Sequence, residues 1–429
     1  MFENNRAFAQ SLDAQDPLAR FRDEFHIPKM QNADGTERDE IYLCGNSLGL
    51  QPKRTQSYLN DELTKWQELG VKGHFSSEHP WMPYHEFLAR QSAALVGANE
   101  QEVVCMNSLT VNLHLMMVSF YRPTKERFKI LIEDHAFPSD TYAVQSQAKF
   151  HGFDAEEAIL KIAPREGEDC IRDEDLFELI EREGEQIALI MLPGVQYYTG
   201  QVFPMQKITE LGHAKGCKVG FDLAHATGNI VMNLHDWGVD FACWCSYKYL
   251  NSGPGSVAGC FVHERHHKDL DLPRFAGWWG QDKSIRFKMG PDFHPIASAE
   301  AWQLSNPPIL SLAAIRASLD VFEAAGGIEK LREKSLKLTD YMRFLLEEEL
   351  SEAIHILTPS EHEARGCQLS LSVKLEGRSG RELFDAIEAA GVTGDWREPN
   401  VIRIAPVPLY NSFEDAYDFV QILKGALND

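Results

Sequence analysis

Short, continuous apolar segments recur along the middle of the chain, and stretches with helical composition separate them. Consecutive rather than alternating apolar positions are typical of strands buried on both faces, as in a mostly parallel sheet covered by helices. The pattern therefore predicts an α/β core over about residues 80–300. The predicted strands are 102–106, 128–132, 187–192, 218–222 and 240–245, and the predicted helices between them are 138–150, 173–184 and 204–216.

The flanks of this core have a different pattern. Residues 52–71 repeat apolar positions at helical spacing, which predicts an amphipathic helix. Beyond residue 308 a long helical region, interrupted near Gly326, is followed by short strands that alternate with helices, which indicates a smaller α+β domain. We therefore expect an N-terminal segment (1–75) that packs on both domains, a large domain (76–305) and a small C-terminal domain (306–429).

Composition and charge restrict the possible partners. The 429 residues are 44% hydrophobic and 25% charged, as in ordinary globular proteins. The formal net charge is -22, so the long-range field repels nucleic acid and anionic membranes, and we expect neither as a partner. No apolar run approaches the roughly 18 residues of a membrane span. Eight cysteines without paired spacing, and an N-terminus without a basic region before an apolar run, predict reduced thiols and a cytoplasmic location.

Polar residues that directly follow the predicted strands are candidates for a ligand site, because open parallel sheets bind ligands beyond the carboxyl ends of their strands. Thr110 opens a predicted helix over 111–121, whose free N–H groups and dipole suit a phosphate. A simple helix cap is the alternative. Asp222 ends the strand 218–222 and would require a cation or a strong donor if it is buried, whereas a turn-forming aspartate is the alternative.

A third strand end carries a lysine. Lys248 stands between two tyrosines, after the strand 240–245 and before a glycine-rich turn. Burial at this position would lower the pKa of the amine and make it a nucleophile for carbonyl groups, and a surface lysine that reaches water is the alternative. A phosphate-binding helix start, a strand-end aspartate and a buried lysine together match the phosphate, ring nitrogen and aldehyde of pyridoxal phosphate. The combination predicts a site for this cofactor.

These stretches, with others in the same order between residues 42 and 413, closely resemble the kynureninase family of pyridoxal phosphate enzymes, which have the aspartate-aminotransferase fold (fold type I). The resemblance implies a large domain with a mostly parallel seven-stranded sheet covered by helices, a smaller α+β C-terminal domain, and a homodimer with shared active sites. The stretches are GNSLGL (45–50), LTVNLH (109–114), FPSD (137–140), YYTGQ (197–201), FDLAHA (221–226), HDWGVD (235–240), YKYLN (247–251), SNPPI (305–309) and RIAPVPLYNS (403–412).

The resemblance also assigns residues to roles. Lys248 would bind the cofactor aldehyde covalently, and Asp222 would pair with the pyridinium nitrogen. Arg403 would bind the substrate α-carboxylate through its planar fork. The other cofactor contacts would be Leu109, Thr110, Phe137, Asp140, His225 and Tyr247, with Trp278 and Asn306 reaching across from the partner subunit, and the aryl pocket would contain Ser47, His74, Ser305 and Asn306.

The implied reaction is the hydrolytic cleavage of the Cβ–Cγ bond of L-kynurenine or 3-hydroxy-L-kynurenine, a step of tryptophan catabolism and of de novo NAD synthesis. The products are anthranilate or 3-hydroxyanthranilate, and L-alanine. Lys248 would move the Cα proton, and Tyr247 is the candidate proton donor for later steps. The polar aryl pocket favours the 3-hydroxy substrate, because a site built to hydrogen-bond a hydroxyl discriminates against the analogue that lacks it.

Other interpretations are weaker. A cysteine desulfurase or selenocysteine lyase shares the fold but requires a nucleophilic cysteine on a mobile loop, and Cys367 is predicted to lie at the start of a strand. A non-catalytic binding protein of this fold would lack Lys248, Asp222 or Arg403, and all three are present. The histidines at 263, 266 and 267 lack an accompanying set of ligands at metal-binding spacing, so we predict a solvated turn and no metal site.

Overall fold

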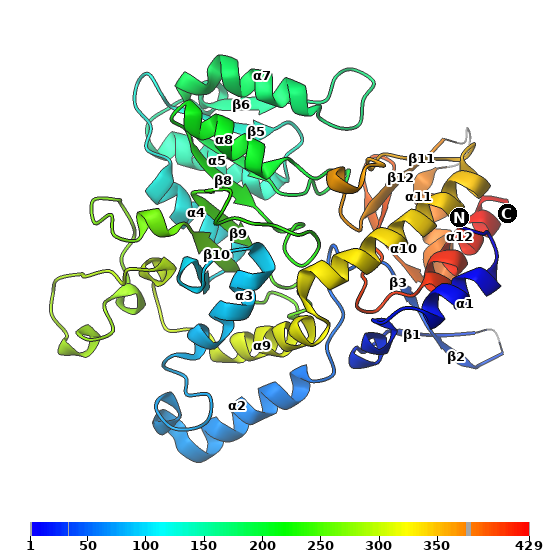
Figure 1. Ribbon diagram of the computed structural model, residues 1–429, viewed down its shortest axis with the longest axis horizontal. Coiled ribbons are helices and arrows are strands. Elements are labelled where there is room, and N and C mark those ends of the chain that lie inside the picture. Colours follow the sequence, from blue (N-terminus) through cyan, green and yellow to red (C-terminus); the bar gives the residue numbers. More distant parts are fainter. Residues whose placement is uncertain (1, 33, 375–378, 429) are drawn as a thin grey trace.

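The computed structural model describes residues 2–32, 34–374 and 379–428. In this part of the chain a seven-stranded sheet forms the centre of the large domain (Figure 1). Five adjacent strands are parallel, whereas β10 is antiparallel to both of its neighbours. The spatial order is β4 (Val103–Cys105), β10 (Gly259–Val262), β9 (Phe241–Trp244), β8 (Lys218–Asp222), β7 (Ile187–Pro193), β5 (Lys129–Glu133) and β6 (Ile159–Ile162).

Helices cover both faces of this sheet, and apolar side chains fill both interfaces. The three helices predicted between the strands begin and end within two residues of α5, α7 and α8. One prediction is wrong in detail, because α4 has Ser108 as its N-cap, so Thr110 lies inside the first turn and does not open the helix. One face carries α4 (Leu109–Phe120) and α5 (Pro138–Phe150), and the other carries α3 (Ala89–Val96), α7 (Asp173–Glu183), α8 (Met205–Ala214) and α9 (Ile309–Ala324), while the short α6 (Ala155–Ala158) precedes β6.

Two strands of the large sheet were not predicted, and each has a physical reason. β6 is an edge strand with partly exposed side chains, so it lacks a continuous apolar run. β10 begins at Gly259, a residue with low strand propensity. A Cβ atom at this position would lie 2.1 Å from the ring of Trp244 on the neighbouring strand. The absence of a side chain at Gly259 therefore leaves space for the ring of Trp244.

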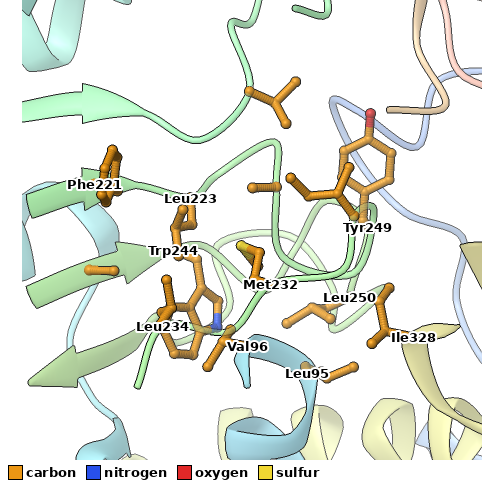
Figure 2. Close-up of a cluster of buried hydrophobic side chains, with 14 of the residues drawn as sticks. Leu95, Val96, Phe221, Leu223, Met232, Leu234, Trp244, Tyr249, Leu250 and Ile328 are labelled. Atoms are coloured by element: carbon orange, nitrogen blue, oxygen red, sulfur yellow. The ribbon is translucent and has the colours of Figure 1, made fainter. Parts of the chain in front are cut away.

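The core anchors the loop that carries Lys248 (Figure 2). Tyr249 and Leu250, which directly follow the lysine, are 2% and 3% exposed and belong to the same cluster as Phe221 and Trp244 of the sheet. Burial of each such side chain stabilises the fold by about 1.5–3 kcal/mol. The backbone of the lysine loop is therefore fixed by apolar packing on its C-terminal side.

The small domain has an antiparallel four-stranded sheet with helices packed against it, and both ends of the chain lie beside it in Figure 1. The long helix α10 begins in the core of the large domain, to which Ile328 belongs, and ends in that of the small domain, to which Leu350 belongs. The elements are β11 (Ile354–Ile356), β12 (Leu369–Val373), β15 (Val401–Ile404) and β14 (Asp395–Arg397), with α10 (Gly327–Leu350), α11 (Gly380–Ala389) and α12 (Phe413–Asn428).

The N-terminal segment runs along both parts of the molecule. Helix α1 (Arg6–Ala14) packs on α12, and β3 (Ile41–Tyr42) pairs in parallel with β13 (Val392–Thr393). A few residues after β3, the N–H of Gly49 donates a 2.8 Å hydrogen bond to the carbonyl oxygen of Tyr247 in the lysine loop. The remaining elements are a hairpin of β1 (Lys29–Gln31) and β2 (Glu37–Asp39), and helix α2 (Thr55–Leu69), which packs on α9. None of the described helices is both long enough and apolar enough to cross a membrane.

Candidate active site

A cavity of about 310 Å³ opens at the carboxyl ends of the parallel strands, where the small domain faces the sheet. Its walls come from the ends of β5, β7 and β8, the starts of α4 and α5, the lysine loop and two arginines of the small domain. Ten residues predicted for the site line it together: Ser47, Leu109, Thr110, Phe137, Asp140, Asp222, His225, Tyr247, Lys248 and Arg403.

Lys248 and His225 form a close polar pair in the cavity. The lysine Nζ lies 2.9 Å from Nε2 of His225. Burial, and then the charge of Lys248, hold the pKa of His225 well below its usual range, so the ring is neutral and Nε2 accepts the lysine proton. Nδ1 of His225 then carries a buried N–H that has no partner among the described residues. A buried donor without a partner indicates a missing ligand.

Two interacting aspartates, Asp140 and Asp222, line the cavity together with the lysine. The N–H of Ala224 donates to Asp222 Oδ1 at 2.7 Å and fixes this carboxylate at the end of β8. Burial raises the pKa of both carboxyls, and it raises that of Asp140 more strongly because the charge of Asp222 adds to the effect. Asp140 therefore holds the proton and donates to an ionised Asp222. The cavity thus presents one negative charge opposite Lys248.

Two helix starts meet at the opposite end of the cavity. The hydroxyls of Thr110 in α4 and Ser139 in α5 lie 2.8 Å apart. Both helices direct their free N–H groups and positive dipole ends toward the same space, which is the arrangement that binds phosphate groups in proteins. Tyr247 lies at this wall, and burial raises the pKa of its hydroxyl, which therefore stays protonated.

Arg403 of β15 is 1% exposed and reaches the cavity from the small domain. Its Nη2 lies 2.8 Å from Asp395 Oδ2, and its Nη1 donates to the carbonyl oxygen of Tyr197 at 2.6 Å. Its Nε has no partner among the described residues. The guanidinium is held in one orientation, and a carboxylate ligand would satisfy the donor that remains.

Four predicted residues lie outside this cavity. His74 contacts the carbonyl oxygen of Val71 and packs edge-on against the ring of Trp81. Trp278 is 40% exposed, and Ser305 and Asn306 are exposed as well. The resemblance places Trp278 and Asn306 in the cavity of the partner subunit, which remains a prediction because the structure contains a single chain.

Among the lining residues that were not predicted, three bear on the chemistry: Glu133, Tyr197 and Arg397. Glu133 ends β5, as Asp222 ends β8, so the rule that selected Asp222 could also have selected Glu133. Burial, and then the charge of Asp222, raise the pKa of Glu133 to about 8. Tyr197 packs edge-on against Phe137 with the ring centroids 5.3 Å apart. Arg397 shares the carboxylate of Asp395 with Arg403, a contact that no local sequence pattern indicates.

The histidine segment after β10 differs from the prediction of a solvated turn. His266 and His267 are buried. Nε2 of His266 lies 2.7 Å from Asp240 Oδ1, and Nε2 of His267 contacts the carbonyl oxygen of Val262 at 2.9 Å. The prediction is wrong because the buried carboxylate of Asp240, which is far from the segment in the sequence, requires hydrogen-bond donors.

The fold and this site define the chain as a pyridoxal phosphate enzyme of fold type I. The donor set fits the cofactor, since two helix starts can hold its phosphate, Asp222 its ring nitrogen and Lys248 its aldehyde. The unpartnered Nδ1 of His225 is a further donor that a bound ring would satisfy.

Comparison with known proteins gives the family. A model of the kynureninase C-terminal domain matches residues 331–423. A kynureninase of Koribacter versatilis is 58% identical, covering 100% of this chain and 99% of that protein. Those of Myxococcus xanthus and Nematostella vectensis are 55% and 48% identical, with coverage of at least 98% of this chain and 94% of the relative. The chain belongs to the kynureninase family.

Solved structures with a similar fold include cysteine desulfurases. One from Escherichia coli has a TM-score of 0.74 at 15% identity and covers 96% of this chain and 98% of its own. Another, from Thermococcus onnurineus, has a TM-score of 0.72 at 16% identity and covers 91% and 95%. The likeness concerns the fold alone. Cys367 is 1% exposed and burial raises the pKa of its thiol to about 12, so it has no nucleophilic character.

Proposed function

We propose that this protein hydrolyses the Cβ–Cγ bond of L-kynurenine and 3-hydroxy-L-kynurenine, releasing anthranilate or 3-hydroxyanthranilate and L-alanine. The observation that carries the proposal is the presence of Lys248, Asp222 and Arg403 in one cavity of a chain that is 58% identical to a kynureninase over its full length. Water supplies the oxygen of the new carboxyl group, and a proton completes the methyl group of alanine.

Each wall of the cavity has a task in cofactor binding. The starts of α4 and α5, with Thr110 and Tyr247, hold the phosphate, and Phe137 covers the ring face. Asp222, ionised and fixed by the Ala224 N–H, holds a proton on the ring nitrogen. Pyridoxal phosphate supplies an electron sink for the bonds broken at Cα and Cβ.

The chain's own groups hold and move the protons. Lys248 Nζ takes the proton from the substrate Cα, and the neutral His225 at 2.9 Å keeps the amine oriented. The hydroxyl of Tyr247, which remains protonated because burial raises its pKa, donates the proton that Cβ receives after cleavage. Arg403 binds the α-carboxylate and keeps Cα within reach of Lys248.

A homodimer would complete the aryl pocket. His74 and Trp278 lie on surface segments that also expose large apolar side chains. Exposed apolar surface of this kind is typical of protein interfaces. The segments carry Val71 and Phe75, which are 76% and 67% exposed, and Phe287 and Met289, which are 57% and 74% exposed.

The eight cysteines are free, and seven of them are buried. Free thiols are typical of proteins in a reducing compartment, which supports the cytoplasmic location that the sequence predicts.

One assay tests the proposed reaction. The holoenzyme should release fluorescent anthranilate from L-kynurenine, and its 3-hydroxy analogue faster from 3-hydroxy-L-kynurenine. A Lys248→Ala chain should have no turnover, and borohydride should attach the cofactor to Lys248 in the wild-type chain. Release of sulfide from L-cysteine without anthranilate from either kynurenine would replace the proposal with a desulfurase.

A second experiment tests the shared site. Trp278→Ala and Lys248→Ala chains should each be nearly inactive alone and should regain activity when they are mixed and allowed to exchange subunits. Persistent inactivity of a mixture shown to contain hybrid dimers would mean that each chain completes its own site.

A further inference from the structure

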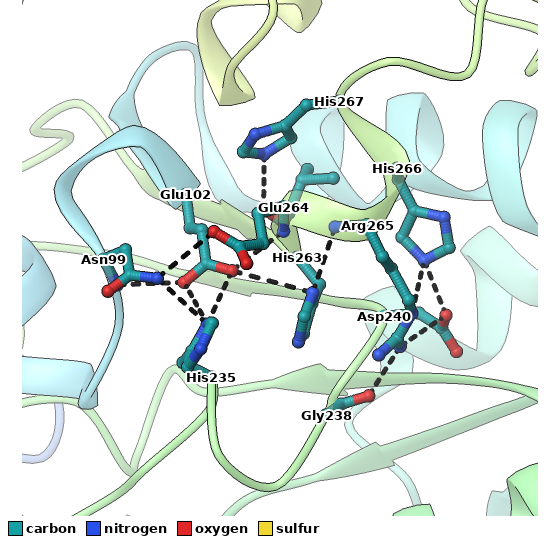
Figure 3. Close-up of polar contacts among 11 residues, drawn as sticks. Asn99, Glu102, His235, Gly238, Asp240, His263, Glu264, Arg265, His266 and His267 are labelled. Atoms are coloured by element: carbon teal, nitrogen blue, oxygen red, sulfur yellow. Dashed lines mark hydrogen bonds and ion pairs between the residues drawn. The ribbon is translucent and has the colours of Figure 1, made fainter.

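Three side chains from distant parts of the sequence meet at the end of the large sheet opposite the active-site cavity (Figure 3). Glu102 directly precedes β4, His235 lies in the loop before β9, and His263 directly follows β10. One potential ligand atom from each of the three lies within 4.8 Å of the other two. The proposed reaction uses none of these residues.

The carboxylate of Glu102 is completely buried and fixed in position. The N–H groups of Asn99 and Glu264 donate to its two oxygens at 2.9 and 2.8 Å. Nδ1 of His235 lies 3.0 Å from each oxygen, and Nδ1 of His263 lies 3.7 Å from Oε1. The two imidazole rings stack with centroids 5.1 Å apart and planes inclined by 17°. All three groups therefore face one small space.

His263 presents an unprotonated nitrogen beside this space. Its Nδ1 accepts the N–H of Arg265 at 3.2 Å, so this nitrogen carries no proton. It therefore has no proton to donate to Glu102 Oε1, which lies 3.7 Å away and carries a like partial charge. A cation between the two atoms would turn this repulsion into attraction.

The surrounding charges favour a cation. The hydrogen bond and charge of Glu102, with the charges of Glu264 and Asp236, raise the pKa of His235. Burial lowers the pKa of His263, and two charges lower it further: that of Arg265, which is itself paired with Asp240 at 2.8 Å, and that of His235. Without a metal, the proton of His235 supplies the positive charge between the ligand atoms.

The distances fit a small divalent ion. Tetrahedral Zn²⁺ with bonds of about 2.0–2.2 Å holds neighbouring ligand atoms roughly 3.3–3.5 Å apart. The observed separations from Glu102 Oε1, 3.0 and 3.7 Å, lie on either side of this value. His235 is partly exposed, which leaves an entry path and room for a water molecule as the fourth ligand.

We propose that Glu102, His235 and His263 form a structural site for a divalent transition-metal ion of the Zn²⁺ class. The metal replaces the proton of His235 and the 3.2 Å hydrogen bond that His263 Nδ1 accepts from the N–H of Arg265. It joins the segments that precede β4 and β9 to the segment that follows β10, and so strengthens the edge of the sheet at its one antiparallel strand.

A second cluster of similar composition shows what distinguishes this one. His85, Glu86 and Glu300 also bring potential ligand atoms together. In that cluster Nζ of Lys283 already lies 2.9 Å from both carboxylates, so a cation of the chain occupies the metal position.

The test uses metal-free holoenzyme, prepared with a chelator that is then removed, and Zn²⁺ as the probe in isothermal titration calorimetry. We expect one saturable site per chain and a rise of the thermal midpoint with Zn²⁺. Affinity should fall between pH 7.5 and pH 5.5, because the metal must displace the proton of His235. With Co²⁺, the visible spectrum should be that of nitrogen and oxygen ligands.

Matched variants locate the site. His263→Gln and His235→Asn should each lower Zn²⁺ affinity at least about tenfold. His355→Asn is the control, since His355 pairs with Asp169 at 2.6 Å without a second histidine, and it should leave the affinity unchanged. Absence of one-to-one binding in the wild type, equal affinity in all three variants, or a thiolate absorption band with Co²⁺ would each overturn the proposal. The pH dependence and the Co²⁺ spectrum need only the wild-type chain, so the proposal remains testable if a variant misfolds.

Discussion

Nζ of Lys248 lies 2.9 Å from Nε2 of His225, a ring that burial keeps neutral. The histidine therefore acts as an acceptor that orients the lysine amine without adding positive charge to it. Its second nitrogen has no partner among the described residues and is left to bind a ligand.

Replacing His225 by glutamine tests this double role. A glutamine can keep one of the two contacts but not both, and the loss of one hydrogen bond to a charged group costs about 1.5–3 kcal/mol. We expect kcat/KM for kynurenine to fall by about 10- to 150-fold and the cofactor to bind more weakly in an absorbance titration. Wild-type values for both quantities would show that the 2.9 Å contact has no role.

Asp140 and Asp222 should respond differently to the same chemical change. Because Asp140 holds the shared proton, an Asp140→Asn amide can still donate to Asp222, and activity near neutral pH should fall by less than about tenfold. Asp222→Asn removes the negative charge that holds the proton on the ring nitrogen, and turnover should fall by at least about a hundredfold. Activity assays of both variants, with cofactor content measured, check the assignment; the opposite order would exchange the two roles.

The raised pKa of Glu133 predicts that the stability difference between a Glu133→Gln chain and the wild type depends on pH. Its pKa is raised to about 8 in the folded protein, so the folded state binds a proton that the unfolded state loses above about pH 4.5. The stability linked to this group is present below pH 4.5 and is lost as the pH rises toward 8. A Glu133→Gln chain should therefore become more stable relative to the wild type between pH 5 and pH 8, as measured by urea unfolding.

The control for this experiment is Glu166→Gln at an exposed position. Its stability difference from the wild type should not change with pH over the same range. A constant difference for Glu133→Gln as well would mean that this carboxyl ionises normally in the folded chain.

Gly49 provides a test of the packing beneath the lysine loop. A Cβ atom at this position would lie 2.3 Å from the carbonyl oxygen of Lys248, so alanine must displace the loop. We expect Gly49→Ala to destabilise the protein by about 1–3 kcal/mol and to lower kcat. Gly290→Ala, where a Cβ atom would meet nothing within 4 Å, should preserve both thermal midpoint and kcat. A Gly49→Ala enzyme with wild-type kcat would show that the loop tolerates the shift.

Much of the fold was predictable because it depends on local patterns. The run of buried apolar residues predicts β7, and the proline predicts the start of α5. Neither prediction requires knowledge of tertiary contacts. The same holds for Asp222, which ends a buried strand, and for Lys248, which lies in the loop that follows one. Family resemblance was required for Arg403 and Phe137, whose own neighbourhoods in the sequence carry no sign of a ligand.

The remainder depends on contacts between distant segments. Arg397 enters the site because it shares Asp395 with Arg403, and His266 is buried because Asp240 needs a donor. The sequence pattern of one segment does not show which distant residues will contact it. The positions of Trp278 and Asn306 depend on a second chain, so neither the sequence nor a single chain can test them.

The N-terminal segment connects the small domain to the lysine loop of the large domain, beside the candidate active site. It is pinned at one end to the small domain, where β3 pairs with β13, and a few residues later to the carbonyl oxygen of Tyr247. A rotation of the small domain about the large one would therefore pull on the backbone beside Lys248. If Arg403 binds the substrate as proposed, these fewer than ten residues would couple that binding to the position of the lysine amine.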